Sequence, residues 1–169
     1  MRILVISDTH GEMDSIDLVR HHVGPVDAVF HCGDSELDSQ HKSLQSAYVV
    51  GGNCDWDSSF PNEVLAEVDG HTVFMTHGHL YQVKSTMIPL SYRAQEVGAE
   101  VVLFGHSHLL GAELVNETLF VNPGSLSLPK GRKEKSYAII EKSAVAWRVS
   151  FFSDEHVEME KETFSFIQK

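Results

Sequence analysis

The sequence is poor in cysteine and in basic residues. Its 169 residues include two cysteines, Cys32 and Cys54, and neither lies in a paired metal-binding or redox motif, so we expect free thiols. Lys and Arg number 13 against 24 Asp and Glu, which gives a formal net charge of -11 at pH 7. Because nucleic acids and anionic membranes are bound by Lys and Arg, this balance excludes an extended nucleic-acid surface. A small phosphoester substrate could still bind if metal ions supplied local positive charge.

The sequence also lacks a long apolar run. Four strongly apolar residues, 3–6, precede Ser7, which is too short a stretch for the core of a signal peptide, and no later run approaches a membrane span. We therefore expect a cytoplasmic protein with no membrane partner. The chain is 42% hydrophobic and 22% charged, as in ordinary globular proteins, and residues 1–169 are predicted to form one domain. A homo-oligomer is left open.

Histidine, in contrast, is abundant, with 11 residues, and this number raises the question of a metal. The first candidate is Asp8-Thr9-His10, which directly follows the first apolar run. In an extended chain alternate side chains share a face, so Asp8 and His10 would aim at one point. By itself the pattern is ambiguous, since Asp and His after a strand are more often a helix cap and a solvated side chain.

Apolar spacing predicts alternating strands and helices in the first third of the chain. A helix is predicted over residues 12–23, ending at Gly24-Pro25, because its apolar residues are spaced by three, three and four positions. These residues are Met13, Ile16, Val19 and Val23. Strands are predicted over 26–31 and 47–50, with a polar segment of weak helical character, 36–46, between them. The β-helix-β order predicts parallel strands, and in such sheets sites form beyond the carboxyl ends.

The rest of the chain is predicted to be mainly β. Asp69-Gly70, the favoured hairpin dipeptide, joins two alternating runs. A helix is expected over 89–97, with Gly98 at its end. The basic stretch 130–135 is expected to be a solvated loop. The predicted strands are 63–68, 71–76, 101–104, 112–115, 119–121, 136–140 and 144–152, the last four consecutive and antiparallel, and the polar tail 154–169 is a candidate edge strand.

Seven residues able to bind a metal fall at the ends of five predicted strands. Each alone has a simple structural explanation, as a turn residue, a packed histidine or a polar loop residue. Their coincidence at equivalent strand ends favours a metal site. The seven are Asp8, His10, Asp34, Asn53, His77, His106 and His108.

This donor set indicates the kind of metal. Four imidazoles and three oxygen-bearing side chains are too many for one tetrahedral ion but suit two divalent ions of borderline softness. We expect manganese, with nickel, iron, cobalt and zinc as alternatives, because magnesium or calcium would require more oxygen ligands. Two cations about 3.5 to 4 Å apart need a bridging anion, and Asp34 is the natural candidate.

The motifs D-T-H, G-D, G-N, H-G-H and G-H-S-H resemble those of the calcineurin-like metallophosphoesterases, and Asn122-Pro123-Gly124-Ser125 with the small size resembles their single-domain bacterial and archaeal phosphodiesterase branch. The resemblance implies an α/β fold, a four-layer αββα sandwich of two mixed β-sheets flanked by helices. It also implies a dinuclear metal-dependent phosphodiesterase in which a metal-bridging hydroxide attacks phosphorus in line with the leaving group. By the same resemblance Asp8, His10 and His108 would bind the first metal, Asn53, His77 and His106 the second, and Asp34 would bridge them.

The sequence departs from the family pattern at Cys54. Many relatives carry a histidine there, which is assigned to stabilise the transition state or to protonate the leaving oxygen. His79 could replace it from the same face as His77, or could instead support the ligands or be solvated. The predicted catalytic residues are Asp34, Asn53, Cys54 and His79.

Other residues leave alternatives open. Asp55 either orients a neighbour in the site or only forms a turn. Residues 122–125 are a candidate for the rim of the site. The histidines that match no ligand motif are predicted to be surface or structural, and they are His21, His22, His31, His41, His71 and His156.

A protein-interaction scaffold is the alternative function. A retromer subunit shares the fold that the resemblance implies, and proteins of that kind can lose metal ligands or catalytic groups. The intact set of seven ligands favours an enzyme, whereas Cys54 keeps a metal-binding scaffold open. A hydrolase of the metallo-β-lactamase type is excluded, because the sequence has no His-x-His-x-Asp-His run.

Overall fold

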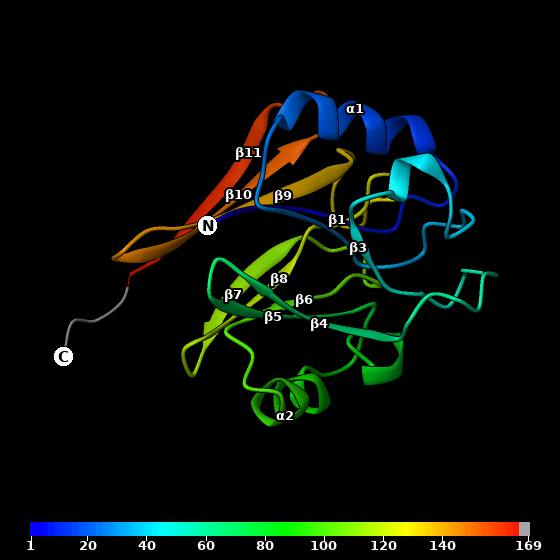
Figure 1. The fold of residues 1–169 in the computed structure, drawn as a ribbon. Helices are drawn as coiled ribbons and strands as arrows, with labels where there is room; N and C mark the ends of the chain where they lie inside the picture. The colour runs from blue at the N-terminus through cyan, green and yellow to red at the C-terminus, as the bar shows by residue number, and fades with distance from the viewer. Residues whose placement is uncertain (166–169) are drawn as a thin grey trace.

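The computed structural model describes residues 1–165, and these form two mixed β-sheets packed face to face, with one α-helix on each outer face (Figure 1). The first sheet contains, in order, β11 (Glu158–Ser165), β10 (Ala146–Ser153), β9 (Ser136–Lys142), β1 (Arg2–Ile6), β2 (Ala28–His31) and β3 (Tyr48–Val49). The second contains β4 (Glu63–Val68), β5 (His71–Thr76), β6 (Val101–Leu103), β8 (Thr118–Asn122) and β7 (Gly111–Val115). This is the predicted αββα sandwich.

The strand β1 is apolar along most of its length because both of its faces are covered. Ile3 and Val5 belong to the core between the sheets, whereas Leu4 and Ile6 pack toward the helix α1 (Met13–Val23). All four side chains are at most 1% exposed. Central parallel strands buried on both faces have such continuous apolar runs, which explains why residues 3–6 do not alternate.

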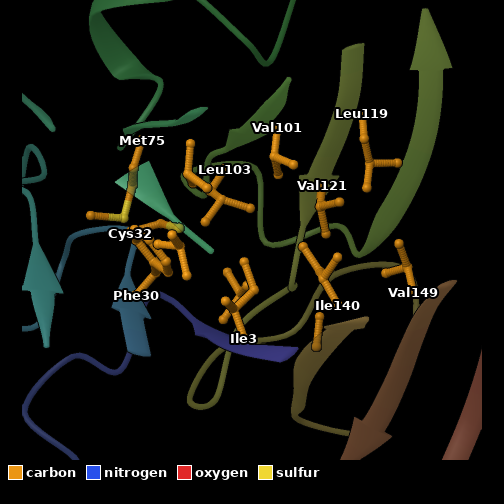
Figure 2. Packing of buried hydrophobic residues seen from close by; sticks show 14 of the residues in the cluster. Ile3, Phe30, Cys32, Met75, Val101, Leu103, Leu119, Val121, Ile140 and Val149 are labelled. Carbon is orange, nitrogen blue, oxygen red and sulfur yellow. The ribbon is translucent and has the colours of Figure 1, made fainter. Parts of the chain in front are cut away.

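The core between the sheets fixes the separation of the strand ends. Figure 2 shows Ile3, Phe30 and Ile140 of the first sheet in one cluster with Leu103 and Val121 of the second. Each of these five side chains is completely buried, and burying a side chain of this size stabilises the fold by about 1.5 to 3 kcal/mol. The two sheets therefore hold their loops in a defined relation to each other.

Each helix attaches through a single apolar face. In α1 the buried residues are Ile16 and Val19, which pack on the first sheet. The helix α2 (Ile88–Glu96) buries Leu90 and Ala94 against the outer face of the second sheet, in a cluster that includes Phe74. Within residues 1–165, neither helix has the length and apolar character needed to cross a membrane.

Several predicted elements are confirmed. Both α-helices lie within a residue of the predicted bounds, and β1, β2 and β3 are parallel as expected. The hairpin joined by Asp69-Gly70 pairs Val68 with His71. The strand β11 lies at the edge of the first sheet, and the last four residues of the predicted tail lie outside the described residues. Both cysteines are free thiols, Cys32 buried and Cys54 exposed.

The weak helical character predicted for the segment 36–46 amounts to a short 3-10 helix, η1 (Lys42–Leu44), because the few apolar residues supply no continuous helical face. One prediction was wrong in part. The strands between 112 and 152 form two antiparallel pairs, β7 with β8 and β9 with β10, but not one consecutive series. Between these pairs the chain changes sheets, because β8 also pairs in parallel with β6, while β9 pairs antiparallel with β1 in the other sheet. The turn at residues 122–125 carries the chain from one sheet to the other.

His31, at the end of β2, is a completely buried imidazole, so of the two predicted alternatives, surface or structural, the second holds. Its Nδ1 accepts a hydrogen bond from the Gly33 N–H (3.2 Å), so Nε2 carries the proton and faces the Thr9 hydroxyl at 3.0 Å. Burial lowers the pKa of His31 to about 4, against the attraction of the Asp55 and Asp8 carboxylates. A neutral ring thus links the loops that follow β1 and β2.

The metal-free protein should lose stability as the pH falls from 6.5 toward 4, because the folded-state pKa of His31 lies below its ordinary value of 6.5 and protonation therefore favours the unfolded chain. The loss attributable to His31 amounts to about 3 kcal/mol once the pH is below its folded pKa. Urea unfolding at about pH 7.5 and 4.5 measures it.

The matched variant is His31→Asn, whose amide oxygen can still accept a hydrogen bond from Gly33. It should be less stable than the native protein near neutral pH but should show a smaller difference in unfolding free energy between the two pH values. An equal difference in both proteins would show that the acid sensitivity comes from other groups.

Candidate metal centre

The loops at the carboxyl ends of β1 and β2 are joined backbone to backbone. The Asp8 N–H donates to Gly33 O and the His10 N–H donates to Asp34 O, both at 3.0 Å. These bonds continue the pairing of the two parallel strands beyond their last residues. The predicted ligands of the two loops are therefore held side by side.

Five of the seven predicted ligands have a left-handed backbone. The expectation that Asp8 and His10 lie in an extended chain was wrong, because β1 ends at Ile6 and both residues have positive φ. Asp and His adopt this conformation more readily than most residues, but it costs about 1 to 3 kcal/mol at each position. The φ values are 53° at Asp8, 44° at His10, 51° at Asp34, 65° at His106 and 60° at His108.

Asp8 is completely buried, and only one of its oxygens is satisfied. Oδ2 accepts from the Ser7 hydroxyl (2.5 Å) and from the His106 N–H (3.1 Å). Oδ1 receives no hydrogen bond from the described chain, although it lies 3.0 Å from His108 Nε2. A side chain at Gly105 would collide with this arrangement, since an added Cβ would lie 2.5 Å from Asp8 Oδ2. Asp8 Oδ1 and His108 Nε2 therefore face each other in the way that two ligands of one metal ion would.

Asp34 and His77 form the second part of the centre. His77 Nδ1 donates to Cys32 O (2.7 Å), so Nε2 is the nitrogen that faces Asp34 Oδ2 at 3.3 Å and Asn53 Oδ1 at 3.2 Å. Burial alone would raise the pKa of Asp34, but its contact with His77 and the hydrogen bond from the Cys54 N–H (2.7 Å) hold it below the usual range. The contact with Asp34, the nearby Asp8 carboxylate and the hydrogen bond to Cys32 O raise the pKa of His77 against the effect of burial.

His10 and His108 approach Asp8 from the loops after β1 and β6. His10 Nδ1 lies 2.6 Å from Glu36 Oε1, and its buried Nε2 has no hydrogen-bond partner among residues 1–165. His108 Nδ1 donates to Leu128 O (2.6 Å), which directs its Nε2 to Asp8. Contact with the Asp8 carboxylate raises the pKa of His108 despite its partial burial.

His106 and His79 flank the ring of His77. The ring centroid of His106 lies 5.0 Å from that of His77, and that of His79 lies 5.3 Å away. Burial and the neighbouring His77 lower the pKa of His106 to about 4 and also lower that of His79. His79 Nδ1 is buried and makes no hydrogen bond to the described chain. Both rings are thus neutral near pH 7.

Asp55 is not merely a turn residue, because it orients the loops of the site. Its Oδ2 accepts from the N–H groups of Asp34 and Gly52, both at 2.8 Å, and its Oδ1 accepts from the Glu36 N–H at 2.7 Å. One carboxylate therefore connects the loops after β2 and β3. A side chain at Gly52 would lie 2.1 Å from Asp34 Oδ1, so glycine is required there. In the sequence, the only sign of this role was that Asp55 lies two residues after Asn53, a predicted ligand.

The turn at residues 122–125 lies beneath the site and does not form its rim. The buried Ser125 hydroxyl donates to Asp8 O (2.7 Å), and Asn122 Nδ2 donates to Gly105 O (2.9 Å). These bonds brace the two loops that carry Asp8 and His106. Sequence reasoning identified the segment but not its contacts, because they depend on the crossing between the sheets.

The donor atoms fit divalent metal ions. Asp8, His10 and His108 offer ligand atoms within 4.8 Å of one another, as do Asp8, Asp34 and His77. Asp8 is thus common to both groups, whereas the predicted bridge Asp34 belongs to the second only. Asp8 Oδ1 and His10 Nε2, which make no hydrogen bond within residues 1–165, are buried acceptors of the kind that a cation satisfies. His106 lies outside these groups in the described chain.

Comparison with known proteins gives a consistent result. Residues 1–144 match the calcineurin-like phosphoesterase superfamily domain. The chain is 41% identical to a probable metallophosphoesterase of Bacillus subtilis (strain 168) over 161 residues, which cover 95% of each sequence. It is 33% identical to a phosphodiesterase of Escherichia coli (strain K12) over 86% of this chain and 90% of the relative.

Solved structures share the fold. A predicted phosphoesterase from Streptococcus pneumoniae TIGR4 superposes with a TM-score of 0.94 at 37% identity, over 98% of this chain and 97% of the other. Vacuolar Protein Sorting 29 from Cryptosporidium parvum superposes with a TM-score of 0.80 over 98% of each chain. At 17% identity, the second likeness shows the fold alone.

Metal binding should release protons, because His77 and His108 have raised pKa values in the metal-free chain and must give up their Nε2 protons to become ligands. Calorimetric titration with Mn²⁺ in buffers of different ionisation enthalpy gives the number released. This number should fall as the pH is raised from about 6 to 9, while the apparent affinity increases. Proton release that does not change over this range would rule out these imidazoles as ligands.

Proposed function

This chain belongs to the calcineurin-like phosphoesterase superfamily, and we propose that it is a phosphodiesterase that requires two divalent metal ions. The first would be bound by Asp8, His10 and His108, and the second by Asn53, His77 and His106. Asp34 would bridge the two. Manganese is the expected metal, and the substrate class is a small phosphoester.

The observation that carries this proposal is the convergence of buried oxygen and nitrogen atoms that make no hydrogen bond. Asp8 Oδ1 and His10 Nε2 are both buried without a hydrogen bond within residues 1–165, and the Nε2 atoms of two imidazoles, His108 and His77, lie 3.0 and 4.0 Å from Asp8 Oδ1. Leaving a buried carboxylate oxygen unsatisfied is costly, so the arrangement is stable when a cation lies among these atoms. Hydrophilic side chains gathered only for a turn would instead bond one another.

The chain's own residues would position the substrate and prepare the site. When bound, two divalent cations would draw charge from the phosphate oxygens and lower the pKa of water so that hydroxide is available for in-line attack on phosphorus. Asp34 would partly neutralise both cations and keep them close together. The backbone hydrogen bonds that join the loop after β1 to the loop after β2 fix Asp8, His10 and Asp34 before substrate arrives, so that little reorganisation accompanies the reaction.

Protonation of the leaving oxygen is the weak step of this mechanism. The lowered pKa of His79 leaves few protons on its ring near pH 7, so it is a poor general acid. Partial desolvation of the largely exposed Cys54 thiol and the nearby Asp34 carboxylate raise its pKa to about 11, so the thiol is also a weak proton donor. We therefore infer that the leaving group departs with little help from an acid.

A metal-binding scaffold is the second candidate. The superposition with Vacuolar Protein Sorting 29 favours it, but that likeness concerns the fold alone. The phosphoesterase relatives are more similar in sequence, and all seven predicted ligands are present in this chain. Both observations support the hydrolase.

Hydrolysis of bis(p-nitrophenyl) phosphate should require metal. Chelation should abolish release of nitrophenolate, and Mn²⁺ or Ni²⁺ should restore it better than Mg²⁺, because imidazole ligands favour borderline ions. Asp34→Asn, purified in the same way, should keep less than about a hundredth of the native rate, because the cations would then face each other with less anionic screening. It serves as the control for contaminating enzymes.

Full activity in chelated protein, or equal activity in Asp34→Asn, would contradict the proposal. Native protein that binds two metal ions but hydrolyses no mono- or diester would instead favour the scaffold. If Ca²⁺ restored activity as well as Mn²⁺ does, the proposed hydrolase activity would stand, but the predicted preference for metal ions of borderline softness would be refuted.

The hydrolysis rate should depend steeply on the acidity of the leaving group. Nitrophenyl diesters should be cleaved far faster than alkyl or nucleoside diesters, and His79→Ala should leave this dependence unchanged. Cys54→His should help the poor leaving groups most, by up to roughly a hundredfold. The measurement is kcat/KM across a series of diesters. If the native rate is independent of leaving-group pKa while His79→Ala makes it steep, His79 is the acid.

A further inference from the structure

The carboxylate of Glu36 lies beside a predicted metal ligand but belongs to no motif of the site. Its Oε1 is 2.6 Å from His10 Nδ1, while the other ring nitrogen, Nε2, is buried without a partner among the described residues. A carboxylate only accepts hydrogen bonds when ionised, so Nδ1 must carry the proton. The neutral ring then has its lone pair on Nε2, the nitrogen next to the centre.

Glu36 is itself held in place. Its backbone has a φ of 54°, a left-handed conformation that is unfavourable for glutamate. Its N–H donates to Asp55 Oδ1 (2.7 Å), and the same carboxylate group binds the Asp34 N–H. The position of Glu36 relative to His10 is thus determined by the network that also positions the predicted bridge.

Two other histidine ligands donate a hydrogen bond from Nδ1 to a backbone carbonyl rather than to a carboxylate. His77 Nδ1 donates to Cys32 O and His108 Nδ1 donates to Leu128 O, both neutral backbone carbonyls. A carboxylate partner makes an imidazole more basic than a carbonyl partner does, and therefore a stronger metal ligand. This difference distinguishes His10 from His77 and His108.

We infer that Glu36 is a positioning residue that fixes the tautomer of His10 and strengthens the binding of the first metal ion over the second. The inference rests on the proposed metal site but not on its catalytic activity. Loss of such a supporting partner commonly weakens metal binding about 10- to 100-fold. Glu36 would thereby determine which of the two positions fills first.

The test compares metal binding in the native protein, Glu36→Ala and Glu36→Gln, with free Mn²⁺ measured by EPR. Glu36→Ala should weaken one of the two Mn²⁺ sites by about 10- to 100-fold and change the other by less than about threefold. Glu36→Gln retains an acceptor oxygen and should have an intermediate effect. Glu96→Ala removes an exposed carboxylate on α2, away from the centre, and should bind as the native protein does.

A second measurement reports the tautomer directly. In metal-free protein near pH 8, long-range ¹H–¹⁵N NMR spectra should show His10 protonated at Nδ1, and Glu36→Ala should shift the ring toward the Nε2–H form. A merely structural role for Glu36 would change the melting temperature without changing this tautomer. Unchanged tautomer and unchanged affinities in Glu36→Ala would overturn the inference.

These results separate the inference from the proposed function. Two tight sites in the native protein that Glu36→Ala leaves intact refute the role of Glu36 and leave the hydrolase unaffected. A weakened first site in a protein that hydrolyses no phosphoester supports the role of Glu36 and refutes the enzyme. Native protein that binds no Mn²⁺, Zn²⁺ or Ni²⁺ refutes the metal site on which both depend.

Discussion

The buried carboxylate of Asp8 is the constraint on which the site depends. One oxygen is bonded to Ser7 and to the backbone of His106, and the other lies in the interior with no hydrogen bond from residues 1–165. A charge in such a place is tolerated only near compensating positive charge. In the metal-free chain, protons on His108 and His77 supply that charge: contact with Asp8 raises the pKa of His108, and contact with Asp34, followed by Asp8, raises that of His77 against the effect of burial. A cation that displaces these protons would stabilise the native state by mass action.

The left-handed ligands show how the fold maintains this arrangement. Five positions of unfavourable backbone, in the loops after β1, β2 and β6, would relax if these loops were isolated, since each costs about 1 to 3 kcal/mol. Here the two sheets fix the strand ends, the paired loops fix the backbone of Asp8 and His10, and Asp55 binds the loops after β2 and β3. The strain is therefore sustained by contacts outside the site, above all by the core between the sheets.

Much of the fold was predictable because its signals are local. The Asp69-Gly70 dipeptide defines a hairpin, the spacing in 12–23 defines α1, and the G-D, G-N and G-H-S-H motifs indicate the ends of strands. The pairing of β9 with β1 was not predictable, because antiparallel strands 130 residues apart carry no local signal of their partner. For the same reason the sequence left open whether His31 is a surface or a structural residue, and it did not indicate the contact of Glu36 with His10. A positive φ at Asp8 has no sequence signature either, since aspartate also occurs in extended chain.

The burial and orientation of the predicted ligands also bear on the choice between an enzyme and a scaffold. A scaffold requires a surface that matches its partner, and a metal there needs only to stabilise a loop. In this protein three of the seven predicted ligands are buried, with Asp8 and His77 completely buried and Asp34 only 2% exposed, whereas His10, His106 and His108 are partly buried and Asn53 is exposed. In three of the histidines a neighbouring group binds Nδ1 and leaves Nε2 directed toward the centre. Backbone carbonyls bind Nδ1 of His77 and His108, and a carboxylate binds Nδ1 of His10. Preorganised donors of this kind are what stabilisation of a charged transition state requires, and they offer little to a protein partner. The physical character of the site therefore supports hydrolysis of a phosphoester.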